Sequence, residues 1–389
     1  MSKLEQLLAE LCPDGVEYVK LGDIAPPTRG VRVIRSQLAL DGEYPVYQNS
    51  MTPLGYYGES NCPANTAFVI SAGAAGEIGY SSADFWAADD CFYFVCPENL
   101  QSRFLYYALM CQREYLLSRV RRASVPRLAR SVIEGLKIPV PPLPIQSEIV
   151  RILDNFAELT AELTAELTAE LTARKKQYEY YRDLLLSLPN VPRIMLGEVA
   201  TITRGNGLQK CDFTESGVPC IHYGQIYTYY STFTKKTKSF VSPQLAMGLK
   251  KVSNGDIIIA VTSENIEDVC KCVAWLGDED IVTGGHTAIV KHNQNPKYIA
   301  YWLQTMEFFG QKRRIAHGTK VIEVTPRKLE NIEIPIPSLE EQARIAEILD
   351  KFDALTTDIT AGLPAEIAAR QKQYEYYRDK LLTFKEKVA

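Results

Sequence analysis

The sequence is short of the residues and motifs from which enzyme active sites are usually built. It has four histidines in 389 residues, which leaves few side chains for acid–base catalysis near neutral pH. It contains no Gly-x4-Gly-Lys-Ser/Thr segment, so a phosphate-binding loop of that type is excluded. The glycine-rich stretch Ser71–Gly79 lacks the spacing of a dinucleotide-binding loop and is expected to form a hairpin. We therefore expect no catalytic residues in this chain.

Long apolar runs and closely paired cysteines are also missing. The longest apolar runs, such as residues 257–261, are far shorter than the ~18 residues that a membrane-spanning helix needs. The first ten residues mix acidic with apolar side chains and contain no apolar core of a secretory signal. The nine cysteines include no Cys-x2-Cys pair, which argues against a metal site. These absences predict a cytoplasmic protein that binds no metal.

The charge is nearly balanced, and the apolar content is that of a globular protein. The 43 basic and 47 acidic side chains give a net charge of −4, which does not suit a protein that coats nucleic acid over its whole surface. Local basic patches remain compatible with this balance. With 46% hydrophobic residues and a length of 389, the chain is expected to form two or three domains.

The chain contains two copies of one unit. Gln177–Asp183 recurs unchanged 196 residues later, and Ile138–Pro141 has a close match at the same distance. Near the start of the unit, Leu21–Ala25 resembles a segment only 175 residues later, so the variable part of the second copy is 21 residues longer. Residues 4–17 resemble the passage 184–195, so the second constant segment should end beside the start of the first unit.

The constant segments are predicted to be long helices, because apolar residues recur at spacings of three and four after a proline-rich start. Thr-Ala-Glu-Leu occurs three times in tandem from Thr160 to Leu171. Four residues advance a helix by ~400°, so each repeat turns its leucine ~40° further, and the helix can lose or gain one repeat and still pack. The second helix should break near Gly362 and restart with Pro364 in its first turn. The residues expected to line the contact between the helices are Leu159, Leu163, Leu167, Leu171, Leu355, Ile359, Leu363 and Ile367.

The variable parts have a different pattern. Short runs of β-branched and aromatic residues are bounded by turn residues and followed by a helical stretch, near 101–120 and 296–312. Each variable part is therefore predicted to be a compact α/β domain of ~120–140 residues.

Basic residues gather at particular places in both variable parts. Residues 103–137 carry eight Arg or Lys against two Glu, and Arg121–Arg122 aligns with Arg313–Arg314 of the second copy. Arg and Lys neutralise phosphates, while Arg, Gln and Asn recognise base edges. One cluster alone is equally typical of a solvated surface, but clusters in both copies favour DNA binding. The candidate DNA-binding residues are Arg29, Arg32, Arg35, Gln48, Asn49, Arg121, Arg122, Arg127, Arg130, Arg204, Lys210, His222, Tyr223, Gln225, Lys235, Lys236, Arg313, Arg314 and Lys320.

The alternation of variable parts with constant helices, the Thr-Ala-Glu-Leu tandem and the duplicated Gln-Tyr-Glu-Tyr-Tyr-Arg-Asp segment resemble the specificity subunit of a type I restriction-modification system, in the subgroup with Thr-Ala-Glu-Leu spacer repeats. The resemblance covers essentially the whole chain. It implies an α/β fold with two globular target-recognition domains, separated by two long helices that form an antiparallel coiled coil, in a pseudo-two-fold internal repeat. The expected parts are the first target-recognition domain at 1–140, the central helix at 141–188, the second domain at 189–337 and the C-terminal helix at 338–389.

The resemblance also implies a role and partners. In that family each variable domain reads one half of a split double-stranded DNA site, and the helices bind two methyltransferase (modification) subunits. Restriction and translocase subunits join through the complex, and S-adenosylmethionine, ATP and Mg²⁺ serve the partner subunits and not this chain. Half-sites one DNA turn apart would leave a spacer of about six to eight base pairs. Two alternatives stay open: a stand-alone DNA methyltransferase or nuclease, and an adaptor that uses its helices only for protein assembly.

Overall fold

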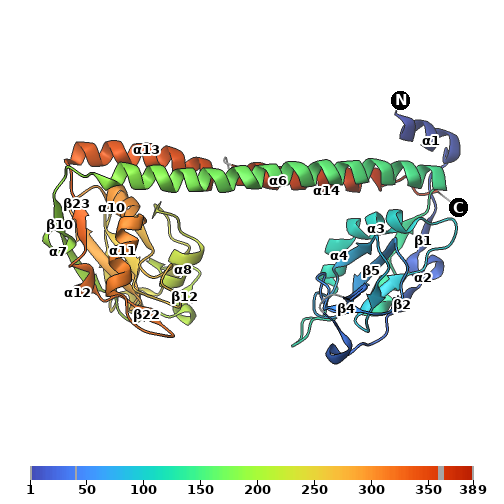
Figure 1. Ribbon diagram of the computed structural model, residues 1–389, viewed down its shortest axis with the longest axis horizontal. Coiled ribbons are helices and arrows are strands. Elements are labelled where there is room, and N and C mark those ends of the chain that lie inside the picture. Colours follow the sequence, from blue (N-terminus) through green and yellow to red (C-terminus); the bar gives the residue numbers. More distant parts are fainter. Residues whose placement is uncertain (1, 40–41, 358–362, 388–389) are drawn as a thin grey trace. The chain divides into compact units, whose positions relative to one another are not determined.

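The protein forms two compact units, which the computed structural model describes for residues 2–39, 42–357 and 363–387 (Figure 1). Unit 1 comprises residues 1–166 and 368–389, and unit 2 comprises residues 167–367. Each unit combines a globular α/β part with helices from the constant segments. The predicted α/β class and the helical nature of the constant segments are confirmed.

The globular part of unit 1 contains small sheets and short helices. Its elements are α1 (Lys3–Leu11), β1 (Tyr18–Lys20), α2 (Leu21–Ile24), β2 (Pro27–Arg29), the 3-10 helix η1 (Arg35–Gln37), β3 (Tyr44–Tyr47), β4 (Tyr56–Tyr57), β5 (Thr66–Ile70), β6 (Ile78–Ser81), β7 (Trp86–Ala87), β8 (Cys91–Phe94), α3 (Ser102–Cys111), α4 (Arg113–Ser118), α5 (Arg130–Glu134) and β9 (Lys137–Pro139). The sheets have the orders β2-β8-β5-β6, β4-β3-β7 and β1-β9. Strand β5 is buried throughout, and α3 packs on it. The glycine-rich stretch forms the predicted hairpin between β5 and β6, with positive φ at Gly73 and Gly76.

The globular part of unit 2 has the same plan with additional strands. Its elements are β10 (Arg193–Met195), α7 (Leu196–Val199), β11 (Ala200–Arg204), η2 (Lys210–Asp212), β12 (Phe213–Thr214), β13 (Val218–Ile221), α8 (Tyr223–Thr228), β14 (Phe233–Thr234), β15 (Ser239–Val241), α9 (Pro243–Ala246), β16 (Lys250–Val252), β17 (Ile257–Ala260), β18 (Thr262–Ser263), β19 (Cys272–Trp275), β20 (Ile281–Thr283), β21 (Thr287–His292), α10 (Pro296–Trp302), α11 (Met306–Ile315), β22 (Ile322–Glu323), α12 (Pro326–Leu329) and β23 (Glu333–Pro335). The sheets have the orders β11-β21-β17-β19-β14, β12-β15-β13-β20-β16, β10-β23 and β18-β22.

The duplication seen in the sequence is repeated in the strand order. The order β2-β8-β5-β6 of unit 1 corresponds to β11-β21-β17-β19 of unit 2, and β1-β9 corresponds to β10-β23. The parallel strand pair β3 with β7 of unit 1 corresponds to the parallel pair β13 with β20 of unit 2. Strand β15 pairs antiparallel with β13 as β4 does with β3, and unit 2 extends these sheets with β12, β14 and β16, in agreement with its longer variable part.

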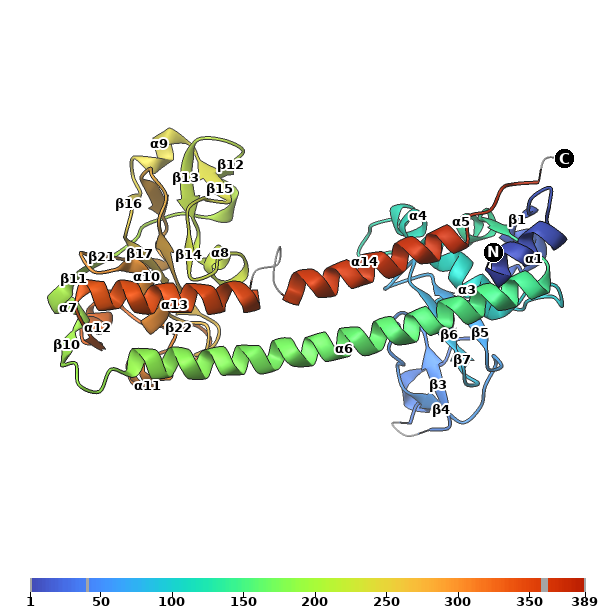
Figure 2. The same cartoon turned by 90° about the horizontal axis from the view of Figure 1, so that it is seen from above.

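Long helices flank the globular parts in both units. They are α6 (Leu143–Ser187), which begins in unit 1 and ends in unit 2, α13 (Leu339–Thr357) in unit 2 and α14 (Leu363–Leu381), which belongs mainly to unit 1. In unit 1 the start of α6 shares a core with Leu382, directly after α14 ends, and in unit 2 the end of α6 shares a core with the start of α13. The paired helices therefore run antiparallel within each unit (Figure 2). The ring contacts Phe156–Tyr377 (6.0 Å) and Tyr181–Phe352 (6.2 Å) are copies of one another.

The predicted contact residues are buried to different degrees. Leu167 is buried and Leu159 is 63% exposed, which the ~40° turn per repeat explains. Ile359 and the side chain of Leu355 lie outside the described residues, as does the predicted break near Gly362. Pro364 is the second residue of α14, which confirms its predicted place in a first turn. The residues that are half-buried are Leu163, Leu171, Leu363 and Ile367.

Each globular part is attached to its helix by a fully buried glutamine. In unit 1 the Gln146 side chain accepts from Gln101 N (2.8 Å) and donates to the carbonyl oxygens of Asn99 (2.8 Å) and Pro141 (2.7 Å). In unit 2 the equivalent Gln342 accepts from the main-chain nitrogen of the residue that caps α10 and donates to the proline carbonyl before α13. Since a buried amide is tolerated only when its hydrogen bonds are made, these contacts hold one orientation.

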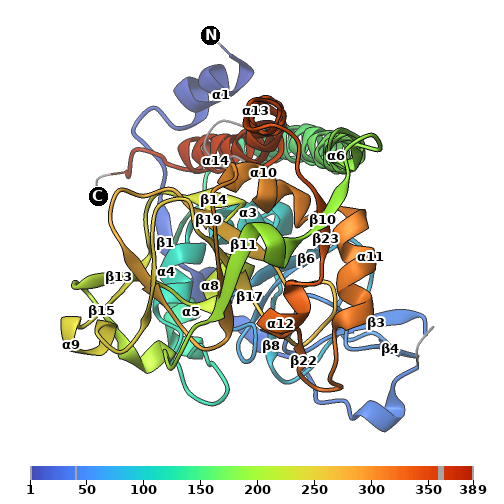
Figure 3. The same cartoon turned by 90° about the vertical axis from the view of Figure 1, so that its left-hand side faces the viewer.

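An aspartate about two helical turns later strengthens the same attachment. Asp154 accepts from Tyr107 Oη (2.6 Å) and Arg103 Nε (2.9 Å). The equivalent contacts in unit 2 join Asp350 to Tyr301 Oη (2.8 Å) and Lys297 Nζ (2.5 Å). Helix α10 lies between β19 and α13 (Figure 3), so this face of the globular part is covered by the helix to which it is bonded.

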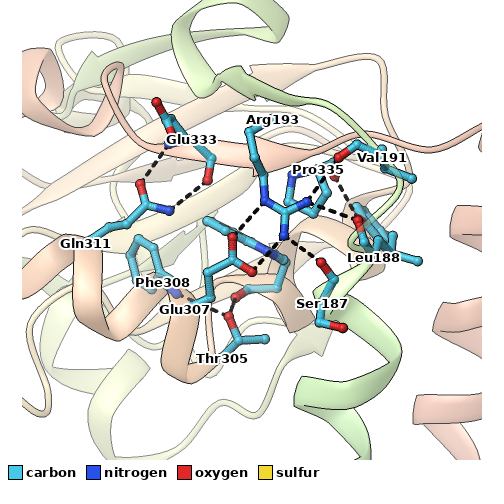
Figure 4. A network of polar contacts seen from close by, with 12 residues as sticks. Ser187, Leu188, Val191, Arg193, Thr305, Glu307, Phe308, Gln311, Glu333 and Pro335 are labelled. Carbon is cyan, nitrogen blue, oxygen red and sulfur yellow. Dashed lines mark hydrogen bonds and ion pairs between the residues drawn. The ribbon is translucent and has the colours of Figure 1, made fainter.

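Arg193 organises the passage from α6 into unit 2 (Figure 4). Its guanidinium pairs with Glu307 (2.8 Å) and donates to the carbonyl oxygens of Ser187 (2.5 Å), Leu188 (3.2 Å) and Val191 (3.2 Å). The Arg193 side chain therefore caps the end of α6 and holds the turn that follows this helix. Through Glu307 it also joins that turn to α11.

The corresponding junction in unit 1 joins two segments far apart in the chain. Val16 N donates to Lys385 O (2.8 Å), Lys387 N donates to Val16 O (3.0 Å), and Phe384 N donates to Tyr18 Oη (3.2 Å). The expectation that the second constant segment ends beside the start of the first unit is confirmed.

Replacing either buried glutamine with alanine should destabilise its unit by about 1–3 kcal/mol, because main-chain groups that it satisfies stay buried without a partner. Urea unfolding of Gln146→Ala and Gln342→Ala measures this. Gln244→Ala, which changes an exposed glutamine of α9, is the matched control and should leave the midpoint unchanged. Equal midpoints for all three variants would contradict the role of the buried amides.

Candidate nucleic-acid interface

Two of the predicted groups occupy the same place in the two units. Gln48 and Asn49 directly follow β3, and His222 and Tyr223 directly follow β13. In both units the preceding strand pairs in parallel with a strand that leads into the next loop, in matching register. The two groups are therefore presented at equivalent strand ends.

Arg29 and Arg204 form a second equivalent pair, at the ends of β2 and β11. Their Nε atoms donate to the carbonyl oxygens of Asp89 and Gly285, both at 2.8 Å. The sequence signal is the triplet Thr-Arg-Gly, which occurs at residues 28–30 and again 175 residues later. Sequence reasoning selected both arginines by charge but missed this repeat.

The glycine after each arginine is required by a close approach of two chain segments. A Cβ on Gly30 would overlap the carbonyl oxygen of Ala87, and one on Gly205 would overlap that of Gly284. The same tight crossing therefore holds both arginines beside the loop that precedes β8 or β21.

A hairpin after the short helices brings further predicted residues to this region. In unit 1 hairpin 121–127 is closed by hydrogen bonds between the main chains of Arg121 and Arg127 (2.8 and 3.1 Å). In unit 2 hairpin 317–323 is closed in the same way between His317 and Glu323 (3.1 and 2.8 Å). The residue after each hairpin donates to the residue after the central buried strand, β5 or β17, at 2.8 and 3.0 Å. The hairpins are thus fixed to the core of each unit.

This register corrects the sequence alignment of the basic pairs. Arg121 corresponds to His317, 196 residues later, and Arg122 corresponds to Gly318. Arg313 and Arg314 lie instead in the last turn of α11, before the hairpin. The sequence alignment of these pairs was wrong by four residues, because it matched two pairs of adjacent arginines and not the residues that close the hairpins.

In unit 1 these elements meet around the glycine-rich loop. Ala74 N donates to Asn49 O (2.9 Å), and Gly73 N donates to Pro126 O (3.1 Å). Gln48 Nε2 donates to Asp89 Oδ1 (3.3 Å) beside the Arg29 contact. The surface therefore combines a strand end, a glycine-rich loop and hairpin 121–127.

In unit 2 aromatic side chains occupy the corresponding surface. Tyr223 lies between the rings of His222 (4.4 Å) and His286 (4.8 Å). His286 Nδ1 contacts Thr262 Oγ1 (2.8 Å), and Arg204 Nη1 pairs with Glu323 Oε1 (2.5 Å). Neither His286 nor Glu323 is among the residues that the sequence predicted to bind DNA.

The protein family of this chain follows from its similarity to a known family. The type I restriction modification DNA specificity domain matches the chain twice, at residues 13–173 and 193–369. These two matches cover most of both units.

The chain belongs to the DNA specificity proteins of type I restriction-modification systems.

Similar proteins agree with this membership. A protein of Haemophilus influenzae described as a type I restriction enzyme specificity subunit is 32% identical over 394 residues, covering 95% of this chain and 96% of that protein. The specificity subunit of the Escherichia coli EcoR124I/EcoR124II enzyme is 38% identical over 263 residues, 64% of this chain and 63% of that protein. A solved structure from work on the assembly and conformational transition of the type I system shares the fold, with a TM-score of 0.68 at 16% identity over 95% of this chain and 97% of that one.

Family membership settles the class of function. The relatives are specificity subunits, so this specificity subunit recognises DNA for a complex and is not an enzyme by itself. The stand-alone methyltransferase or nuclease and the adaptor without DNA are not supported. Within the residues described, no helix is long and apolar enough to cross a membrane.

The remaining candidate residues of the specificity subunit lie in several places. Gln225 has both ends of its amide engaged, with His222 N (3.1 Å) and Ser239 Oγ (2.6 Å), so it caps α8. Arg130 pairs with Glu134 in α5 (2.7 Å). The residues that are exposed are Arg32, Arg35, Arg121, Arg122, Arg127, Lys210, Lys235, Lys236, Arg313, Arg314 and Lys320.

His222 is held in its neutral form. Burial lowers the pKa of its imidazole, and the nearby charges of Lys210 and His286 lower the pKa further. Its Nδ1 accepts a hydrogen bond from Gly224 N (3.2 Å) at the start of α8, which requires an unprotonated nitrogen. Both the cap and the lowered pKa therefore favour the neutral form of the imidazole.

Acidification should weaken unit 2 through this histidine. Because the pKa of His222 is lowered in the folded state from its usual 6.5, the unfolded chain binds the proton more readily, and the stabilisation is lost as the pH falls below that value. His222→Asn keeps a side-chain acceptor for the cap and removes the titration. Denaturant midpoints between pH 7.5 and 5.5 should fall less steeply in this variant, and parallel curves would contradict the assignment.

Proposed function

We propose that each unit of this specificity subunit reads one half of a bipartite, asymmetric double-stranded DNA site with the strand ends and hairpin described above. The observation that carries this proposal is that one main-chain scaffold presents different side chains in the two units. Hairpin 121–127 and hairpin 317–323 are closed by the same hydrogen bonds but share only Val125 and Val321 among their seven residues. A constant scaffold with a variable surface suits two sites that recognise different base sequences.

The helices supply the second part of the proposal, a spacer between the half-sites. Helix α6 is continuous over 45 residues and contains the three Thr-Ala-Glu-Leu copies. A helix with satisfied main-chain hydrogen bonds transmits length and rotation together. We place this chain in the subgroup with such repeats, with a spacer of about six to eight base pairs when the half-sites lie one DNA turn apart.

The helices also offer two matching surfaces for two copies of one partner. Tyr180 is 64% exposed and Tyr376 is 61% exposed, and they occupy the same position of the duplicated segment. Each stands beside a tyrosine, Tyr181 or Tyr377, that stacks on the opposite helix. Exposed aromatic residues on rigid elements are typical anchors of protein interfaces. We assign these surfaces to two methyltransferase subunits.

The wider organisation follows from this assignment. The first target-recognition domain would occupy 1–140, the central helix 141–188, the second domain 189–337 and the C-terminal helix 338–389. Restriction and translocase subunits would join through the complex in the cytoplasm. S-adenosylmethionine, ATP and Mg²⁺ would be used by those partner subunits, and this chain would supply recognition and spacing.

Deleting one repeat, Thr164–Leu167, should shorten the preferred spacer by one base pair and leave both half-sites unchanged. The deletion removes ~40° of net helix rotation, close to the ~36° between neighbouring base pairs. Sequencing of methylated positions in a host that carries the full system measures the spacer. Replacing the same four residues with alanines keeps the helix length and should keep the spacer. An unaltered spacer in the deletion variant would refute the proposed ruler.

Tyr180→Ser and Tyr376→Ser should each reduce the number of bound methyltransferase subunits from two to one, and the double variant should bind none. The reason is the loss of a large exposed anchor from one of two equivalent surfaces. Native mass spectrometry of the assembled complex counts the subunits. Tyr229→Ser, at an exposed tyrosine outside the helices, is the control. Full occupancy in the double variant would exclude these tyrosines as the docking surface.

A further inference from the structure

One register position of the hairpins carries opposite charges in the two units. Arg127 closes hairpin 121–127, and Glu323 occupies the equivalent position of hairpin 317–323. Hairpin 121–127 holds three arginines and no acid, while hairpin 317–323 holds one lysine and one glutamate, so their net charges are +3 and 0 with His317 neutral.

The charge at positions 127 and 323 decides whether the neighbouring arginine, Arg29 or Arg204, has an ion-pair partner. Arg29 and Arg204 lie at the same place and make the same 2.8 Å hydrogen bond through Nε. Arg204 also pairs with Glu323 at 2.5 Å, and the two side chains are 42% and 30% exposed. In unit 1 the equivalent partner is Arg127, and within the described part of the chain neither Arg29 nor Arg127 forms an ion pair. The same two positions therefore carry two cations in unit 1 and a neutral pair in unit 2.

The two arrangements suit different contacts with DNA. Unpaired exposed arginines neutralise phosphates and release counterions, whatever the base sequence. Arg204 has two of its five N–H donors engaged, with Gly285 O and Glu323, which fixes the plane of the guanidinium and leaves three donors. A guanidinium in a fixed plane is the group that forms a bidentate contact with guanine O6 and N7.

We propose that the Arg127/Glu323 reversal divides the work between the units: Arg29 and Arg127 bind the DNA backbone in unit 1, and Glu323 is a positioning residue that holds Arg204 for a guanine edge in unit 2. This inference rests on the proposed function, since it requires that both surfaces face DNA. At these two positions unit 1 therefore gains affinity that depends on salt, and unit 2 gains base discrimination that depends little on salt, in addition to the base contacts by which each unit reads its own half-site.

The test measures the salt dependence of DNA binding by the full chain assembled with its methyltransferase subunits. The probes are a duplex with the mapped target and duplexes in which one half-site is replaced. The slope of log K against log [NaCl] is negative, and Arg127→Ala should make it less steep by about 0.9 on every duplex, because one phosphate contact is lost. Lys385→Ala, which removes an exposed cation from the C-terminal segment, is the control and should leave the slope unchanged.

The unit 2 variants should behave differently. Arg204→Ala should change the steepness of the salt dependence by much less than Arg127→Ala, because Arg204 is directed at a base edge and neutralises no phosphate, and should reduce the preference for the intact second half-site by about tenfold or more. Glu323→Gln should make the slope steeper by about 0.9 and should reduce the preference for the intact second half-site, since Arg204 is then free to turn to a phosphate. Thermal unfolding of each variant identifies any loss of fold.

Two results would overturn the inference while leaving the proposed function in place. One is an equal change of slope in Arg127→Ala and Arg204→Ala. The other is an unchanged preference for the second half-site in both Arg204→Ala and Glu323→Gln, which would make the ion pair a structural contact of the hairpin only. A wild-type complex that does not distinguish intact from replaced half-sites would instead refute the proposed function itself.

Discussion

The attachment of each globular part to its long helix is the constraint on which the rest of the structure depends. Gln146 and Gln342 are buried amides whose hydrogen bonds are made only in one relative position of helix and globular part. Asp154 and Asp350 add a second fixed point further along the helix. A recognition surface is useful to a spacer helix only if it cannot rotate on that helix, and two polar attachments in a row prevent such rotation.

The duplication gives one chain two recognition surfaces that can differ, as the proposed asymmetric site requires. Both units use the same strand order, the same tight crossing after Arg29 and Arg204, and the same hairpin closure. These features are made by the main chain and by glycine, so they tolerate change in the exposed side chains. The surface can therefore diverge between the units without loss of the fold, and the opposite charges at 127 and 323 are one result of that freedom.

Sequence reasoning predicted the helices and the α/β nature of the variable parts because apolar spacing is a local property of the chain. It also predicted the restart of α14 around Pro364 and the end of the second constant segment beside the start of the first unit, a junction that residues 384–387 and 16–18 form. It failed where equivalence depends on long-range pairing. Arg121 and Arg122 were matched to the wrong arginines, and the cap that the amide of Gln225, a candidate DNA-binding residue, forms on α8 was not predicted. Neither capping nor hairpin register is visible from residue type alone.

The sequence by itself determined that the protein is a duplication of variable and constant parts, because the repeat at 196 residues and the Thr-Ala-Glu-Leu tandem are properties of the chain. It also determined the helical nature of the constant parts, since helix periodicity is set by neighbouring residues. Only the tertiary structure decided which basic residues share a surface and which are neutralised. The pairing of Arg204 with Glu323, 119 residues away, arises from strands that meet in space, and so the charge of the candidate interface is a product of the fold.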